Sequence, residues 1–179
     1  MMKTAFQFAL AFLVSVGVVC AQQQSPSAQA TVTIAGKTLT VKYSAPSVRG
    51  REGHLFGPGG KISTDRNYPV WRAGANAATA FHTDADLDVA GLTVPAGNYT
   101  LFVLVEDQNA WQLIVNKQTG QSGLSYDKAQ DLGRVQMTMS KPPTLVEMLK
   151  YTLSDEGGNK GKLDLAWENH VATVPITVK

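Results

Sequence analysis

The sequence predicts an all-β protein, with one antiparallel β-sandwich of jelly-roll-like form following an N-terminal signal peptide. Three observations predict it. Apolar residues alternate with polar ones through most of the chain, and short stretches rich in Gly, Pro, Asn or Asp separate the alternating runs. No stretch after the apolar N-terminus keeps a helical period. The length that remains suits one domain with one core.

A secretory signal peptide is predicted for residues 1–21. A cationic residue precedes an uncharged apolar run shorter than a bilayer span, and Ala21 is the small residue at the cleavage position. A lipid anchor on Cys20, the chain's one cysteine, is the alternative. Gly17 and Val19 argue against it, because lipoprotein cleavage requires a large aliphatic residue at the first of these places and a small residue at the second.

Composition indicates where the protein is located and which classes of partner are excluded. Cleavage after Ala21 leaves no cysteine, so we expect a periplasmic or secreted protein whose fold needs no disulfide. Losing Lys3 lowers the formal charge from +2 to +1, which excludes a nucleic-acid binder driven by global charge. No second apolar run reaches spanning length, so we expect no membrane span.

A polar linker is expected over residues 22–30, and the β-sandwich domain over 31–179. The domain opens with a predicted hairpin of period two around the turn at residues 35–37, with the apolar positions Val32, Ile34, Leu39, Val41 and Tyr43.

The strand expected over Tyr99–Val105 is apolar on both faces, so we place it centrally in a sheet. Pro175 interrupts the last predicted strand and removes a backbone donor, which places that strand at an edge or a bulge. The remaining strands are expected at Ala78–Thr83, Trp111–Val115, Arg134–Met139, Leu145–Ser154 and Leu163–Trp167.

Two long loops interrupt this pattern. Residues 47–69 combine several glycines with Arg49, Arg51 and other cations, and long loops in compact domains are often functional. Residues 116–131 are polar and could hold one short helix near Tyr126–Gln130.

The segment Tyr68–Thr79 carries the most specific chemistry, because it has no regular period and combines an indole, a guanidinium and an amide. We therefore predict a binding site for a small anionic or glycan ligand, formed by Arg49, Arg51, Trp71, Arg72 and Asn76. In the alternative, Arg72 and Asn76 satisfy the backbone of this segment, and Arg72 pairs with an internal carboxylate such as Asp65 or Glu168.

Several of these motifs together resemble a bacterial family of secreted proteins of unknown function, DUF2911. The resemblance covers about residue 40 to the end, and its pieces are Tyr43-Ser44-Ala45-Pro46 with Gly50-Arg51, Val70-Trp71-Arg72-Ala73-Gly74-Ala75-Asn76 with Ala78-Thr79, Pro95-Ala96-Gly97-Asn98-Tyr99-Thr100-Leu101-Phe102, Trp111 with Ile114, Asn116 and Lys117, and Leu163, Leu165, Trp167 and Glu168. It implies an extracytoplasmic β-rich domain and supplies no reaction, ligand or cofactor.

No catalytic residue, metal ligand or cofactor is assigned from the sequence. The mature chain has neither a cysteine nor a Gly-x-Ser-x-Gly elbow, and its histidines show no metal-binding spacing. The leading hypothesis is therefore a non-enzymatic module for an anionic or polyhydroxyl ligand or a cell-envelope partner. The alternatives are a hydrolase with His54 or His170 as base beside a carboxylate, and a structural or interaction domain of the envelope.

Overall fold

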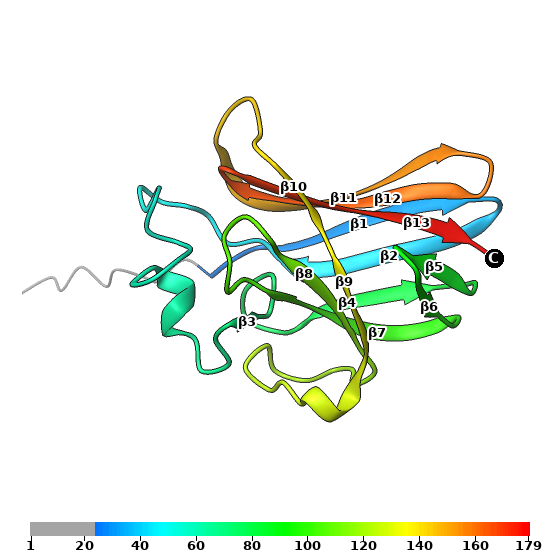
Figure 1. Cartoon of the computed structure of the whole chain (residues 1–179), viewed down its shortest axis with the longest axis horizontal. Helices are drawn as coiled ribbons and strands as arrows, with labels where there is room; N and C mark the ends of the chain where they lie inside the picture. The colour runs from blue at the N-terminus through cyan, green and yellow to red at the C-terminus, as the bar shows by residue number, and fades with distance from the viewer. Residues whose placement is uncertain (1–23) are drawn as a thin grey trace, which may run out of the picture.

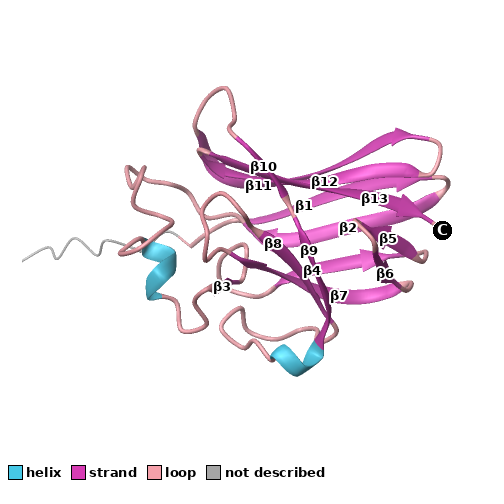
Figure 2. Ribbon diagram, viewed as in Figure 1, coloured by secondary structure: helices cyan, strands magenta, loops and turns pink. Residues whose placement is uncertain are grey.

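The computed structural model describes residues 24–179, and residues 1–23 lie outside the described part (Figure 1). The predicted signal peptide, Cys20 and the cleavage position after Ala21 therefore lie outside it too. The described residues form two antiparallel sheets that pack as a sandwich, as the alternating sequence predicted (Figures 1 and 2).

The first sheet contains the strand that the sequence placed centrally. In it β7 pairs with β8 along one side, while β4 and then the short β3 pair with successive stretches of its other side. Its strands are β1 (Ser27–Ile34), β2 (Lys37–Ser44), β4 (Thr79–Thr83), β7 (Gly97–Leu104), β8 (Gln112–Asn116) and β9 (Asp131–Gln136), in that order, with β3 (Val70–Trp71) paired to β7.

The second sheet is built mainly from the C-terminal third of the chain. Its order is β11 (Val146–Gly157), β12 (Lys160–Glu168), β13 (His170–Val178), β5 (Leu87–Val89) and β6 (Leu92–Val94), with β10 (Thr138–Ser140) paired to β13.

The main core lies between the sheets, and each strand contributes every second residue to it. On β12, for example, Leu163, Leu165 and Trp167 are buried, whereas the residues between them are partly exposed. β7 is apolar on its other face as well, where Phe102 packs with Ile114 and Val70 in a small separate cluster. The burial of both faces explains why β7 lies inside its sheet.

Two expectations from the sequence are wrong. β1 begins at Ser27, so four residues of the expected linker 22–30 pair with β2. The last strand, β13, is an inner strand rather than an edge, since β12 pairs along one side of it and β10 and β5 share the other. Pro175 lies between the stretches paired with β10 and β5, so its missing N–H interrupts neither ladder.

The long loops contain the two short 3₁₀ helices, η1 (Lys61–Thr64) and η2 (Lys128–Gln130). η2 lies in the stretch where the sequence allowed a short helix. The loop 45–69, with η1, covers the end of the sandwich opposite the C-terminus (Figures 1 and 2). Leu55, Phe56 and Ile62 of this loop are buried, so it packs as part of the core.

Candidate functional site

All five predicted site residues line one cavity of about 460 Å³, which we call the cationic cavity. Arg49 and Arg51 come from the start of the 45–69 loop, whereas Trp71, Arg72 and Asn76 lie in and after β3. Sequence reasoning thus grouped residues that the fold brings together. Lys61 and Asp65 also line this cavity, so four cationic side chains face one carboxylate and the formal charge is +3.

Arg51 is held by its own loop. Its Nε donates to the carbonyl of Val48 at 2.8 Å and its Nη2 to the carbonyl of Ser47 at 2.7 Å. A guanidinium has five N–H donors, so these two bonds orient the group and leave the other donors for a ligand.

Arg72 pairs with Asp65, as the structural alternative from the sequence proposed. Nη2 donates to the two carboxylate oxygens at 3.1 and 3.3 Å, and both side chains are mostly buried. Nε of Arg72 is also buried, yet it has no acceptor among the described residues. A buried donor without an acceptor costs about 1–3 kcal/mol, so the guanidinium keeps unused binding capacity.

The second long loop supports Arg72 through Gly123. A Cβ at this position would lie 2.5 Å from Cδ of Arg72 and 2.8 Å from the carbonyl oxygen of Asn76. The N–H of Gly123 donates to that same carbonyl at 3.2 Å. Only glycine allows this close approach, which fixes the stem of Arg72 against the 117–130 loop.

The turn after β3 is irregular because core hydroxyls hold its backbone. Ala73 and Asn76 have φ values of 48° and 59°, in the left-handed region that residues other than glycine seldom adopt. The carbonyl of the buried Ala73 accepts hydrogen bonds from Thr79 at 3.1 Å and from Tyr151 at 3.0 Å. These contacts offset the strain of the turn and fix where Arg72 leaves β3.

An aromatic cluster forms the floor of the cavity. Trp71 stacks on Trp167 with ring centroids 5.7 Å apart and an interplanar angle of 15°. Phe56 contacts both indoles edge-on, at 5.4 and 5.8 Å, and also packs against Trp111. The indole N–H groups of Trp71, Trp111 and Trp167 are buried without an acceptor among the described residues.

A second cavity, of about 510 Å³, lies against the same cluster, and we call it the Glu168 cavity. Phe56, Glu168 and His170 line it, and Phe56 and His170 are in ring contact at 4.9 Å. Glu168 is only 2% exposed and has φ 55°, which is rare for a residue with a side chain. The N–H of Gly53 donates to Oε1 at 2.6 Å, and Oε2 lies 3.5 Å from Nδ1 of His170.

Sequence reasoning offered Asp65 or Glu168 as the internal partner of Arg72, and the structure has the Arg72–Asp65 pair. His170 was named as a candidate base. One signal in the sequence could have singled out Glu168. It directly follows Trp167, the last apolar residue of an alternating strand, where an acid is unexpected.

The three histidines differ in environment. Burial lowers the pKa of His170, although the nearby Glu168 carboxylate partly opposes the shift. His82 lies outside both cavities, between Asp84 and Asn98 at 2.9 Å each, and these hydrogen bonds raise its pKa. It is satisfied by its neighbours, as the sequence indicated. His54 is exposed in the 45–69 loop.

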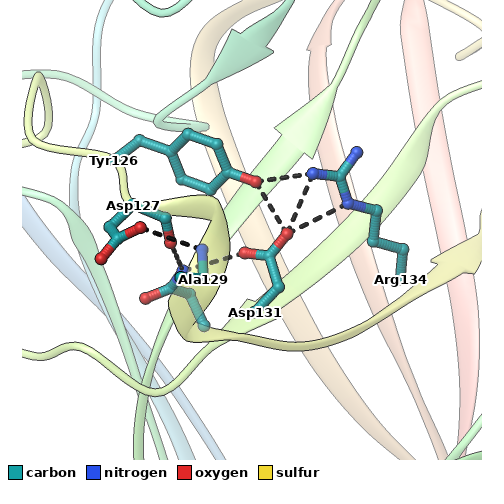
Figure 3. A network of polar contacts seen from close by, with 6 residues as sticks. Tyr126, Asp127, Ala129, Asp131 and Arg134 are labelled. Atoms are coloured by element: carbon teal, nitrogen blue, oxygen red, sulfur yellow. Dashed lines mark hydrogen bonds and ion pairs between the residues drawn. The ribbon is translucent and has the colours of Figure 1, made fainter.

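Figure 3 shows a third polar cluster, which anchors the 117–130 loop. The hydroxyl of Tyr126 donates to Asp131 at 2.7 Å, and Arg134 bonds both the carboxylate of Asp131 and the Tyr126 oxygen. Burial, with the hydrogen bond to Asp131, raises the pKa of Tyr126 to about 12. Because the three side chains satisfy one another and Tyr126 packs on Phe102, this cluster is structural.

The family model described as "Protein of unknown function (DUF2911)" matches residues 25–176. The chain belongs to the DUF2911 family. The match covers both cavities and confirms the resemblance drawn from the sequence motifs. The search of curated proteins found no match to this DUF2911 chain, and neither did the search of solved structures.

Within residues 24–179 of this DUF2911 protein, no three His, Cys, Asp or Glu side chains gather in a way that could hold a metal ion. No helix in that part of the chain has the length and apolar character to cross a bilayer.

Proposed function

We propose that this DUF2911 protein is a non-enzymatic binding module that takes a small anionic ligand in the cationic cavity. The observation that carries the proposal is the convergence of Arg49, Arg51, Lys61 and Arg72 on a cavity with one opposing carboxylate. Such an excess of positive charge in a concave site favours an anion.

The donors suit a carboxylate, sulfate or phosphate. A guanidinium presents parallel N–H groups that match the two oxygens of such a group, and Arg72 retains a buried Nε without an acceptor among the described residues. Trp71 and Trp167 are almost fully buried, so they close the floor of the cavity and offer no open face for stacking a sugar. The geometry therefore favours the anionic half of the ligand class expected from the sequence.

We also propose that the protein works outside the cytoplasm, in the periplasm or after secretion. The support is the sequence of residues 1–21, with its cationic head, apolar run and Ala21. The ligand would then be a free organic or inorganic anion, or an anionic group of a cell-envelope partner. Mass spectrometry of the protein from its own host should find Gln22 as the first residue.

A hydrolase is the second candidate, and one observation favours it. His170 and Glu168 form a mostly buried histidine–carboxylate pair on the wall of a cavity. The arginines line the cationic cavity instead, so a substrate anion held there would not share a cavity with the base. Turnover of chromogenic esters or glycosides that Glu168→Gln abolishes would favour the hydrolase.

The test of the binding proposal is thermal shift with sulfate, phosphate, citrate, succinate and glucuronate, followed by calorimetry. At least one anion should raise the Tm. Arg72→Ala should weaken its binding about tenfold to a hundredfold, because a hydrogen bond to a charged group contributes about 1.5–3 kcal/mol. Arg72→Lys should restore only part of the anion affinity, since lysine keeps the positive charge but lacks the parallel N–H donors of a guanidinium.

Arg66→Ala is the matched control, because Arg66 is an exposed arginine of the same loop that does not line the cavity. It should bind like the unmodified protein. The proposal fails if every anion leaves the Tm unchanged, or if Arg72→Ala and Arg66→Ala respond alike.

A further inference from the structure

The Glu168 cavity differs from the cationic cavity in charge. Its charged lining groups are Glu168 and Lys141, which cancel, and Glu52 near the rim bonds Asn169 at 3.1 Å. The remaining polar lining is uncharged, namely the amides of Gln108, Asn109 and Asn169 and the hydroxyl of Ser140. Amide and hydroxyl groups both donate and accept, so this wall suits a neutral ligand with several hydroxyl groups.

The carboxylate of Glu168 is fixed in place. The residue is the first of the two-residue turn between β12 and β13, where Trp167 pairs with His170. The N–H of Gly53 from the opposite loop donates to one oxygen, which directs the other toward His170. A side chain so buried, in a strained backbone conformation, is held by the contacts around it.

The imidazole of His170 is fixed by aromatic contacts. It stacks on Trp111 with centroids 5.2 Å apart and an interplanar angle of 14°, and Phe56 contacts it edge-on. Its Nδ1 is buried without a hydrogen-bond partner among the described residues, and Oε2 of Glu168 lies 3.5 Å from it. A carboxylate only accepts hydrogen bonds, so the approach of Oε2 favours the neutral tautomer with its proton on Nδ1. Nε2 is then an acceptor, and no group among the described residues donates to it.

We propose that the Glu168 cavity is a second binding site, for a neutral, hydroxyl-rich small molecule the size of a mono- or disaccharide. One ligand hydroxyl donates to Nε2 of His170, while the amides and Ser140 bind the others. The cavity volume of about 510 Å³ lies within the range of small-molecule sites. Since the two cavities are lined by different polar groups, this proposal stands apart from anion binding in the cationic cavity.

The first experiment is calorimetric titration with neutral saccharides, glucose and maltose among them, at pH 7.5. His170→Phe keeps a ring against Trp111 and removes both nitrogens, so it should weaken saccharide binding about tenfold, the value of one lost hydrogen bond. Glu168→Gln should weaken it less than His170→Phe, because an amide that donates to Nδ1 moves the imidazole proton to Nε2, from which a ligand hydroxyl can still accept. His54→Phe is the control, since His54 is exposed and outside the lining.

The second experiment determines which ring nitrogen of His170 carries the proton. Nitrogen-15 NMR of the histidine rings should show His170 protonated on Nδ1 at pH 7.5, and addition of saccharide should shift the Nε2 resonance of His170. The proposal is overturned if no neutral saccharide binds the folded protein, if His170→Phe binds as tightly as the control, or if the proton is on Nε2.

Discussion

The two cavities share one aromatic cluster but differ in charge and in the elements that build them. The cationic cavity is formed by loops, with guanidinium groups held by Asp65 and by backbone carbonyls. The Glu168 cavity takes Glu168 and His170 from the tight turn between β12 and β13, which are paired core strands. The comparison teaches that one packed cluster can support a strongly charged cavity on one side and a cavity with balanced charge on the other.

Trp71→Ala should have the largest effect on stability. Trp71 is 1% exposed, contacts Phe56, Trp111 and Trp167, and forms the floor of the cationic cavity. Removing a buried indole should lower the free energy of unfolding by about 3–5 kcal/mol. Denaturant unfolding measures this, with Leu124→Ala, at an exposed leucine, as the control. A loss below about 1 kcal/mol would contradict a shared packed cluster.

Gly123→Ala should affect ligand binding in the cationic cavity and leave binding in the Glu168 cavity unchanged. The added Cβ would collide with the stem of Arg72 and the carbonyl of Asn76, so we expect a stability loss of about 1–3 kcal/mol. Anion affinity should fall with it, because the guanidinium is displaced, while saccharide affinity should not change. Thr119→Ala, at an exposed position of the same loop, is the control. Equal loss of both affinities would mean that the cavities are not independent.

Tyr126→Phe should have a smaller effect that reaches neither cavity. The change removes the hydroxyl that bonds Asp131 and Arg134 but keeps the ring on Phe102 (Figure 3). We expect a loss of about 1 kcal/mol in unfolding free energy, with both affinities unchanged. A change in anion binding would show that this cluster also positions Arg72.

The pH dependence of stability should be the smallest effect, and two histidines should contribute with opposite signs. Burial lowers the pKa of His170, so its stabilising contribution is complete above the unfolded pKa of about 6.5 and is lost as the pH falls below it. Hydrogen bonds raise the pKa of the exposed His82, so its contribution is present below about 6.5 and is lost as the pH rises through the folded pKa.

Unfolding free energies at pH 5 and pH 8 measure these two contributions. His170→Phe should reduce the loss of stability at pH 5, and His82→Gln should reduce the loss at pH 8. A His170→Phe protein with an unchanged pH profile would mean that His170 titrates like a histidine in water.

The fold was predictable from the sequence because period-two alternation reports which face of a strand is buried. Leu163, Leu165 and Trp167 show this plainly, as does the doubly apolar β7. The prediction drawn from Pro175 was wrong because a missing N–H disturbs a sheet only where a neighbouring strand needs that donor. The sequence does not show that β10 and β5 leave a gap at Pro175 along this side of β13. Over Ser27–Ala30 the inward residues are the small Ala28 and Ala30, so the alternation is weak, and β1 forms there because the chain continues the ladder with β2.

For the cationic cavity, the residues and the Arg72–Asp65 pair were predictable, whereas the bonds of Arg51 to backbone carbonyls were not. Arg49, Arg51, Trp71, Arg72 and Asn76 stood out because guanidinium, indole and amide groups in non-periodic segments can either satisfy the backbone or hold a polar ligand. The Glu168 cavity was not predicted, because its components are far apart in the chain. Gly53 reaches Glu168 across 115 residues, and only the packing of the 45–69 loop against the β12–β13 turn brings them together.

The most direct test of two distinct sites on one aromatic cluster is a cross-titration by calorimetry. Arg72→Ala and His170→Phe are each titrated with the best anion and the best neutral saccharide. We expect Arg72→Ala to lose the anion and keep the saccharide, and His170→Phe to lose the saccharide and keep the anion. Parallel loss of both ligands in either folded variant, or of neither ligand in both variants, would contradict the two-site account.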